Sequence, residues 1–231
     1  MAFIDLKFYS NVLGMQTEVS VILPQGDNTG EIGVESGARP GPYKCLYLLH
    51  GLSDDHTIWA RRTSIERYAQ AYGICVVMPR AEKSFYTDMK YGMNFYTHIA
   101  KEIPAVIREF FNVSDKREDN YIAGLSMGGY GALKIGLREC DRFAAAAGLS
   151  PCADMKSLVE SGAFADVFLP VFGEEKVVSD SDDLLYLLEE KKNNENRPRL
   201  FVGIGTNDFL YENNKPFVFF TWQNAFKVHP Y

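Results

Sequence analysis

The chain has 231 residues, 46% of them hydrophobic, and a formal net charge of −6. This length and composition suit one folded domain with a sizeable core, and we expect a single domain over residues 1–231. The negative charge and the lack of long Lys/Arg runs argue against a nucleic-acid or anionic-membrane surface.

Short apolar runs alternate with segments of helical spacing along the chain. The first half predicts strands over 2–9, 18–23, 43–50 and 74–78, a Gly/Pro-rich loop over 24–42 and a helix over 63–72. The second half predicts helices over 99–111 and up to about 138, and strands over 121–124, 143–149 and 199–205. Residues 152–196 are a variable region where we expect a small cap-like insertion. The alternation predicts an α/β fold with a mostly parallel sheet and helices on both faces.

The segment Gly124–Gly129 reads G-x-S-x-G-G and stands between a predicted strand and a predicted helix. In this setting the pattern is typical of a nucleophile elbow, a tight turn that presents a serine hydroxyl above the sheet. Gly124 and Gly128 are needed because a side chain there would meet the neighbouring strand or helix. Ser126 is therefore the candidate nucleophile.

Two further groups are expected at the same edge of the sheet, because ligands bind beyond the carboxyl ends of parallel strands. An attacked carbonyl needs donors for its developing negative charge. We expect these donors to be the N–H of Met127, directly after the serine, and the N–H of Leu52, in the loop after the strand that ends at His50, with Gly51 as a further candidate. Asp208 follows a later strand and is the candidate acid that orients a base. Its alternative role is to cap a turn or helix.

Three segments resemble the tributyrin-esterase family, which is similar to the S-formylglutathione hydrolases (esterase D). They read YLLHGLSDD over 47–55, GLSMGGYGA over 124–132 and GTNDFLY over 205–211, and Trp59 and residues 61–69 also match. The resemblance covers about residues 1–214. It implies an α/β-hydrolase fold and a serine carboxylesterase acting on short acyl esters, acetylated carbohydrates included, through an acyl-enzyme. It also implies Ser126 as nucleophile, Asp208 as acid and no cofactor.

The C-terminal residues 215–231 depart from that family, which carries its histidine base about 30 residues after the acid. Residues 217–220 are four apolar residues in a row, and no acidic residue follows Glu212. We therefore expect the last helix and strand to be missing or altered, through a truncated or frame-shifted end. His229 is the candidate base, although it precedes any returning strand and is expected near the wrong edge unless the tail is irregular.

The remaining candidate residues have structural interpretations beside the functional ones. His50 and Trp59 are candidates for the substrate pocket, and His50 could instead hold the adjoining loop. His56 follows Asp54 and Asp55, a combination that favours loop bracing over a metal site, and we expect no metal. His98 is expected at the surface or a pocket rim. The aromatic-rich loop over 84–96 either lines a pocket or packs over the sheet.

These features predict a small-molecule ester as the partner, with neither nucleic acid nor membrane, and they are compatible with a homo-oligomer. No basic, apolar leader precedes residue 9, and the four cysteines show no C-x-x-C spacing. Both observations favour a reduced, cytoplasmic protein. Two alternatives to the carboxylesterase stay open. One is a catalytically impaired relative that lacks the C-terminal histidine, and the other is a thioesterase of the S-formylglutathione type.

Overall fold

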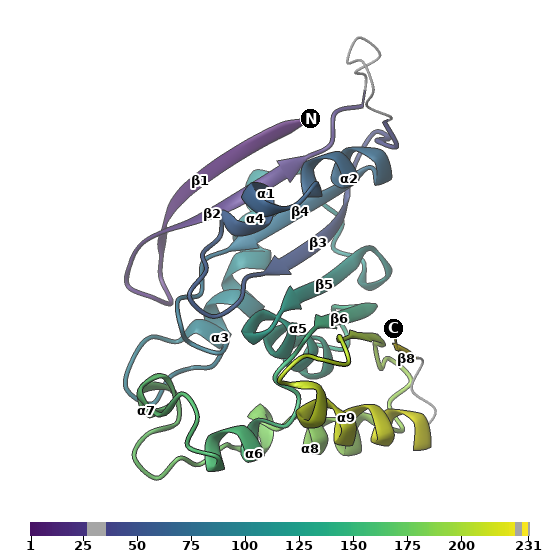
Figure 1. Ribbon diagram of the computed structural model, residues 1–231. Helices are drawn as coiled ribbons and strands as arrows, with labels where there is room; N and C mark the ends of the chain where they lie inside the picture. Colours follow the sequence, from purple (N-terminus) through teal and green to yellow (C-terminus); the bar gives the residue numbers. More distant parts are fainter. Residues whose placement is uncertain (27–35, 225–227, 231) are drawn as a thin grey trace.

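The computed structural model describes residues 1–26, 36–224 and 228–230, and within them the strands form one sheet (Figure 1). The spatial order is β1-β2-β4-β3-β5-β6-β7-β8. The strands are β1 (Ala2–Ser10), β2 (Met15–Leu23), β3 (Lys44–Leu49), β4 (Ile74–Pro79), β5 (Asn120–Leu125), β6 (Ala145–Leu149), β7 (Arg199–Gly203) and β8 (Val228–Pro230). The pairs β1–β2 and β2–β4 are antiparallel, and all other neighbours are parallel.

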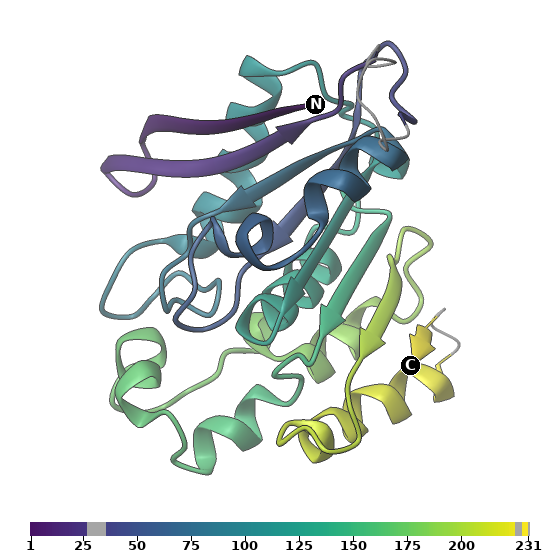
Figure 2. The ribbon, with the colours of Figure 1, turned by 45° about the horizontal axis from the view of Figure 1, so that its top comes forward.

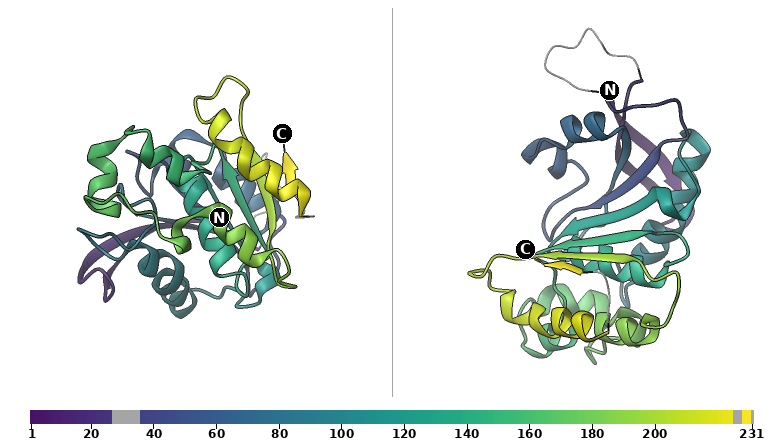
Figure 3. Two further views of the ribbon diagram at one scale, coloured as in Figure 1. Left: turned by 90° about the horizontal axis from the view of Figure 1, so that it is seen from below. Right: turned by 90° about the vertical axis from the view of Figure 1, so that its right-hand side faces the viewer.

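Helices cover both faces of the sheet (Figure 3). One face carries α2 (Ile65–Tyr72), preceded by the short α1 (Ile58–Arg62). The other face carries α4 (Ile103–Phe110), α5 (Met127–Arg138), α8 (Leu184–Lys191) and α9 (Tyr211–Gln223). The shorter helical segments are α3 (Phe95–Thr97), a π-helical turn η1 (His98–Glu102), η2 (Arg117–Asp119), α6 (Met155–Glu160), α7 (Ala165–Phe172) and η3 (Asp180–Asp182). No helix in the described part of the chain is long and apolar enough to span a membrane.

The core follows this layering and divides into two clusters. The larger one lies under the four-helix face and includes Tyr47, Ile122 and Leu133. The smaller one lies between α2 and the sheet and includes Met78 and Ala69. Helix α5 sits at the centre of the larger cluster, since every residue of it except Arg138 is buried. A helix buried on all sides is fixed by its packing, so its first residue is held firmly against the sheet.

The predicted alternation of strands and helices is confirmed. The alanine-rich segment Ala145–Leu149 is a strand, because it pairs with β5 on one side and β7 on the other. Helix α1 was not expected from the sequence pattern. Within residues 152–196, α6 and α7 lie beyond the sheet edge toward which the arrowheads of β5, β6 and β7 point (Figure 2). In contrast, α8 belongs to the helical layer, where it packs against α5 and α9.

The last helix and strand, which the sequence analysis expects to be missing or altered, are both present. Helix α9 forms, and β8 pairs in parallel with β7 over three residues. The run of apolar residues hid the helical spacing: Asn214, Phe217 and Thr221 are buried at intervals of three and four, whereas Phe219 and Trp222 are exposed. The buried face is therefore helical in period, although the charged residues of the exposed face, Glu212 and Lys215, stand only in the first half of the helix.

Candidate active site

Ser126 forms the junction between β5 and α5. Its backbone has φ 56° and ψ −116°, a conformation that residues other than glycine rarely adopt. The junction is held by two backbone hydrogen bonds. The N–H of Ser126 donates to the carbonyl of Leu149 on the neighbouring strand (2.8 Å), and the N–H of Tyr130 donates to the carbonyl of Ser126 (3.0 Å). Such a strained serine between strand and helix has the geometry expected of a nucleophile elbow.

The glycines on either side of Ser126 allow helix α5 to lie directly against the end of β3. A Cβ added to Gly124 would come within 2.3 Å of the Gly128 carbonyl oxygen. A Cβ added to Gly128 would come within 2.5 Å of the carbonyl oxygens of Leu49 and His50. Both obstacles are backbone atoms, which cannot rotate away as side chains do. The spacing of the two glycines around the serine is therefore a steric requirement of the turn.

We expect Gly128→Ala to lower the free energy of unfolding by roughly 2–4 kcal/mol, because the added methyl group forces α5 away from β3. The measurement is urea unfolding followed by circular dichroism. The matched control is Gly26→Ala, where the added carbon has nothing within 4 Å. A Gly128→Ala protein as stable as the control would show that α5 does not lie as close to β3 as the structure places it.

The loop after β3 adjoins Ser126 and contains an amide without an acceptor. A Cβ built on Gly51 would lie 3.8 Å from Cβ of Ser126. The N–H of Leu52 makes no hydrogen bond to any described residue. Met127 is the first residue of α5, so its N–H has no acceptor within the helix. The structure therefore places Gly51, Leu52 and Met127 around Ser126, with two amide donors unused.

His50 holds this loop by its side chain. Its Nε2 accepts a hydrogen bond from the N–H of Ala81 (3.0 Å), which leaves Nδ1 to donate to the carbonyl of Gly51 (2.8 Å). Burial of the imidazole lowers the pKa of His50, so the neutral form is favoured. Tyr86 adds a hydrogen bond from its hydroxyl to the His50 carbonyl (2.9 Å). Since both ring nitrogens are engaged, His50 braces the backbone as its structural interpretation predicts.

Trp59 makes a similar contact from α1. Its indole N–H donates to the carbonyl of Leu49 (3.0 Å), at the last residue of β3. The side chain is partly buried and packs against the smaller core cluster. In these contacts Trp59 supports the strand that leads into the Gly51–Leu52 loop.

Asp208 and Cys152 approach Ser126 from the two strands beyond β5. Asp208 follows β7 and accepts a hydrogen bond from the N–H of Leu210 (2.8 Å), so it also caps the turn into α9. Cys152 follows β6, and its thiol lies within hydrogen-bonding reach of the Ser126 hydroxyl. Burial raises the pKa of Cys152 to about 12, and the nearby Asp208 carboxylate acts in the same direction. The thiol is therefore neutral at ordinary pH.

His229 lies on β8, opposite Phe201 of β7. The expected position before any returning strand is therefore corrected, because His229 is part of that strand. Phe201 stands two residues before Gly203, which pairs with Leu149 near the carboxyl edge of the sheet. His229 is therefore set back from that edge by two residues. The side chain of His229 is outside the described part of the structure. Among the described residues, no hydrogen bond joins Ser126 to an imidazole.

The other two histidines lie beside glutamates elsewhere in the fold, and each has one ring nitrogen without a hydrogen-bond partner among the described residues, Nε2 in His98 and Nδ1 in His56. His98 is fully buried, which corrects the expected surface position, and its Nδ1 lies 2.6 Å from Oε2 of Glu102. Its burial follows from this partner one helical turn away and from Ser10 of β1, whose hydroxyl also donates to Glu102. His56 is buried with Nδ1 3.9 Å from Oε1 of Glu18. The described residues contain no group of three or more potential metal ligands.

A buried ion pair beside the elbow was not anticipated from the sequence. Lys134, on α5, is fully buried, and its ammonium group donates to the carboxylate of Asp182 (2.9 Å), the hydroxyl of Thr87 (2.7 Å) and the carbonyl of Phe85 (3.2 Å). Tyr130 donates from its hydroxyl to the Asp182 carbonyl (2.6 Å). Lys134 thus joins α5 to both the aromatic-rich loop and the 152–196 region. Its only signal in the sequence is a lysine within the apolar part of α5.

Comparison with known proteins agrees with this geometry. The family described as "Putative esterase" matches residues 10–226. An acetyl esterase of Caldicellulosiruptor saccharolyticus is 30% identical over 227 residues, covering 93% of this chain and 84% of the relative. The structure is similar to FphF, a fluorophosphonate-binding serine hydrolase of Staphylococcus aureus, with a TM-score of 0.87 and 35% identity. It is also similar to the S-formylglutathione hydrolase FrmB of S. aureus, with a TM-score of 0.82 and 34% identity. This chain aligns over its full length with both structures and covers 89% of each.

Proposed function

The chain belongs to the esterase family, and we propose that it hydrolyses short-chain acyl esters, acetylated carbohydrates included, through an acyl-enzyme on Ser126. The fold is that of α/β-hydrolase esterases, and the family supports a carboxylic ester hydrolase. The observation that carries the proposal is the strained conformation of Ser126 beside two amide groups that have no acceptor. The acetyl esterase among its relatives supports a short acyl group.

In the proposed reaction, the Ser126 hydroxyl attacks the carbonyl carbon and its proton passes to a base. The carbonyl oxygen becomes an oxyanion, which the N–H groups of Met127 and Leu52 stabilise. Gly51 has no side chain to obstruct the carbonyl. Collapse of the tetrahedral intermediate expels the alcohol, which takes the proton from the base. Water then attacks the acyl-enzyme by the same route, with general-base assistance, and releases the acid and Ser126.

Asp208 and His229 are the proposed acid and base. Two observations support Asp208 as the acid. It follows β7, and its charge raises the pKa of Cys152, a residue that also interacts with the Ser126 hydroxyl. A carboxylate in this position would orient the imidazole and stabilise its protonated form. His229 is assigned because His50 uses both ring nitrogens to hold its loop, and because no described imidazole makes a hydrogen bond to Ser126. No cofactor is required for this chemistry.

A second candidate is a catalytically impaired relative, and the register of β8 favours it. His229 pairs with Phe201 rather than following the end of the strand. Loss of a working base can lower kcat by as much as about a million-fold, because the members of a triad act as a unit. A third candidate, a thioesterase of the S-formylglutathione type, is supported by the likeness to FrmB.

We expect a small fluorophosphonate to form a covalent adduct on Ser126, because only an activated serine displaces fluoride rapidly. The measurement is peptide mass spectrometry after a timed incubation, beside turnover of 4-nitrophenyl acetate. An adduct together with turnover that His229→Ala removes would support the esterase with His229 as base. An absent adduct and absent turnover would favour the impaired relative. An adduct on another serine would contradict the assignment of Ser126.

The choice between oxyester and thioester rests on relative kcat/KM values. We expect kcat/KM for the acetyl oxyester to exceed kcat/KM for S-formylglutathione by about tenfold or more, as the acetyl esterase relative suggests. The opposite order would favour a thioesterase.

We further propose a reducing, cytoplasmic location, supported by four cysteines that are all buried free thiols.

A further inference from the structure

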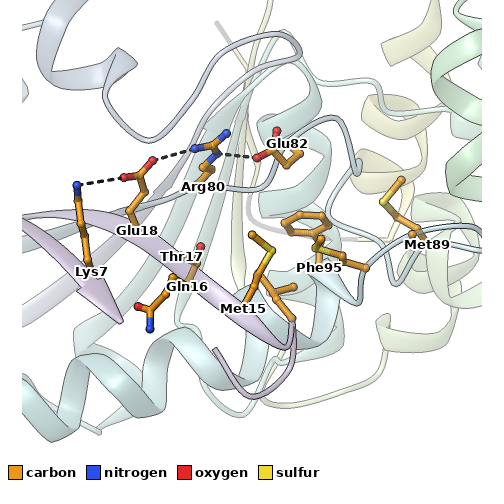
Figure 4. Close-up of a pocket in the computed structure, with 12 residues that line it drawn as sticks. Lys7, Met15, Gln16, Thr17, Glu18, Arg80, Glu82, Met89 and Phe95 are labelled. Carbon is orange, nitrogen blue, oxygen red and sulfur yellow. Dashed lines mark hydrogen bonds and ion pairs between the residues drawn. The ribbon is translucent and has the colours of Figure 1, made fainter. Parts of the chain in front are cut away.

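A pocket of about 630 Å³ lies between the β1–β2 hairpin and the loop that follows β4 (Figure 4). We call it the methionine pocket, because three of its lining residues are Met15, Met89 and Met93. Phe95 and Leu13 complete the apolar part of the lining. A volume of this size suits a small molecule, and unbranched methionine side chains adapt to both alkyl and aromatic groups.

The methionine pocket is separate from the Ser126 site. Glu18 and Arg80, which line the pocket, lie next to the paired residues Val19 and Pro79. They are therefore at the sheet edge where β4 ends, the same edge as Ser126. In the sheet order, β2 and β5 are separated by β4 and β3. Three strand spacings correspond to about 14 Å. A ligand in the methionine pocket therefore lies well outside contact with the reacting atoms.

The charged side chains of the pocket form a row of ion pairs with no net charge. Glu18 Oε1 accepts from Nη1 of Arg80 (2.8 Å), and Glu82 Oε1 accepts from Nε of Arg80 (2.6 Å). Lys7 lies 4.0 Å from Oε2 of Glu18 (Figure 4). Two cations and two carboxylates alternate and sum to zero, so the row offers no net attraction to an ion. A charged ligand would have to break one of these pairs.

The pocket also presents uncharged polar groups that have no partner. The side chains of Gln16 and Thr17 make no hydrogen bond to a described residue, nor does Nη2 of Arg80. Gln16 and Thr17 are neighbours in β2 and point to opposite faces of the strand, so only Thr17, on the face of Met15, can act together with Arg80 Nη2 on one hydroxyl or amide next to the methionines. An apolar lining with such groups beside it matches a molecule that has an apolar body and an uncharged polar head.

We propose that the methionine pocket is a second small-molecule site, which binds an uncharged amphiphile: a phenyl or short alkyl group bearing a hydroxyl or amide. The apolar body contacts the methionines and Phe95, and the head lies toward Thr17 and Arg80. The site goes beyond the proposed esterase activity and does not depend on it.

The test uses three probes with one apolar body: 4-phenylbutan-1-ol, 4-phenylbutanoate and 4-phenylbutylamine. Binding is followed by NMR of ¹³C-methyl methionine, assigned by single substitutions. We expect the alcohol to shift the methyl signals of Met15, Met89 and Met93 with one shared dissociation constant. Met127, beside Ser126, reports on the active site, and buried Met78 reports on the fold. Their signals should stay in place.

Both charged probes are expected to bind at least about tenfold more weakly than the alcohol, because each brings an unpaired charge to an apolar site. Equal binding of the three probes would overturn the proposal. So would an alcohol that shifts none of the three pocket methionines, or that shifts Met127 in step with them.

Two variants make the test specific. Met15→Lys, at a half-exposed position, is expected to weaken binding of the alcohol at least about tenfold. The matched control is Phe110→Lys, an exposed apolar residue on α4 outside the pocket, which should bind as the wild type does. Unchanged Met78 and Met127 signals verify folding in both. Ser126→Ala should bind the alcohol normally whether or not the protein is an esterase. Wild-type affinity in Met15→Lys would refute the site.

Discussion

Replacing Ser126 by alanine is expected to lower kcat/KM for 4-nitrophenyl acetate by about 10⁴-fold or more, because it removes the attacking oxygen. The measurement is the initial rate under conditions where the wild type turns over. Alanine is the suitable replacement, since it keeps a Cβ and therefore the steric demand of the φ 56° turn. Thermal unfolding should accordingly change little, and the loss of activity would report on the hydroxyl.

Two features sharpen this prediction. Cys152 cannot take over as nucleophile, because burial raises its pKa to about 12 and keeps the thiol protonated. Ser150 provides the matched control, since it also follows the end of a strand and has a positive φ of 44°. We expect Ser150→Ala to retain activity within a few-fold. If Ser126→Ala kept more than a tenth of the wild-type rate, the serine mechanism would be wrong for this protein.

The elbow is predictable from the sequence because everything that creates it lies within a few residues. Gly124 and Gly128 are needed for a close approach of backbone atoms, and the strand and helix that flank them have clear patterns. The alternation of strands and helices likewise predicts a mostly parallel sheet with helices on both faces, whereas the order of the strands in it comes from the structure. Local sterics and the spacing of apolar residues were thus sufficient to predict the fold class and the place of Ser126.

Features that depend on contacts distant in the sequence were missed. His98 was expected at the surface, yet it is buried because Glu102 and Ser10 provide it with polar partners. The C-terminal helix was doubted for its run of apolar residues, although the period of its buried residues was helical. The position of His229 depends on the register between β8 and β7, which neither strand specifies alone. The ion pair of Lys134 and Asp182 joins residues 48 positions apart.

That ion pair also gives large expected effects on stability. We expect Asp182→Asn to lower the free energy of unfolding by roughly 2–4 kcal/mol at pH 7, because it leaves a buried ammonium group without its counter-charge. Lys134→Met is expected to cost less than Asp182→Asn, because the Asp182 carboxylate that it leaves unpaired is slightly exposed and still accepts a hydrogen bond from the Ser179 hydroxyl (2.6 Å). The measurement for both is urea unfolding.

The double variant completes the comparison. Lys134→Met combined with Asp182→Asn should be more stable than Asp182→Asn alone, because no unpaired buried charge is left. Lys156→Met serves as the control: this lysine is itself half-exposed, and its partner Asp183 keeps the hydrogen bond from the N–H of Leu185, so its loss should cost little. Equal destabilisation by Lys134→Met and Asp182→Asn would contradict the argument, and would mean that Lys134 stabilises through its hydrogen bonds to Thr87 and Phe85.

The same pair predicts how stability depends on pH. Burial lowers the pKa of Lys134 from 10.5 to about 8, against the opposing effect of Asp182. Between these two values the unfolded chain binds more protons than the folded protein, so stability rises with pH. The cost of the buried cation is full below pH 8 and fades as pH approaches 10.5. We therefore expect the wild type to gain about 1 kcal/mol relative to Lys134→Met between pH 7 and pH 9.

The contacts of this ion pair also have a consequence for the proposed active site. Lys134 holds the loop that contains Phe85 and Thr87 against α5, and it holds Asp182 of the 152–196 region on the same helix. We expect Asp182→Asn to raise KM for an ester more than it lowers kcat, because it loosens the 84–96 loop and the 152–196 region, which we propose contact the ester, while Ser126 stays on the buried start of α5. A fall in kcat at unchanged KM would instead place the effect of the ion pair on the elbow itself.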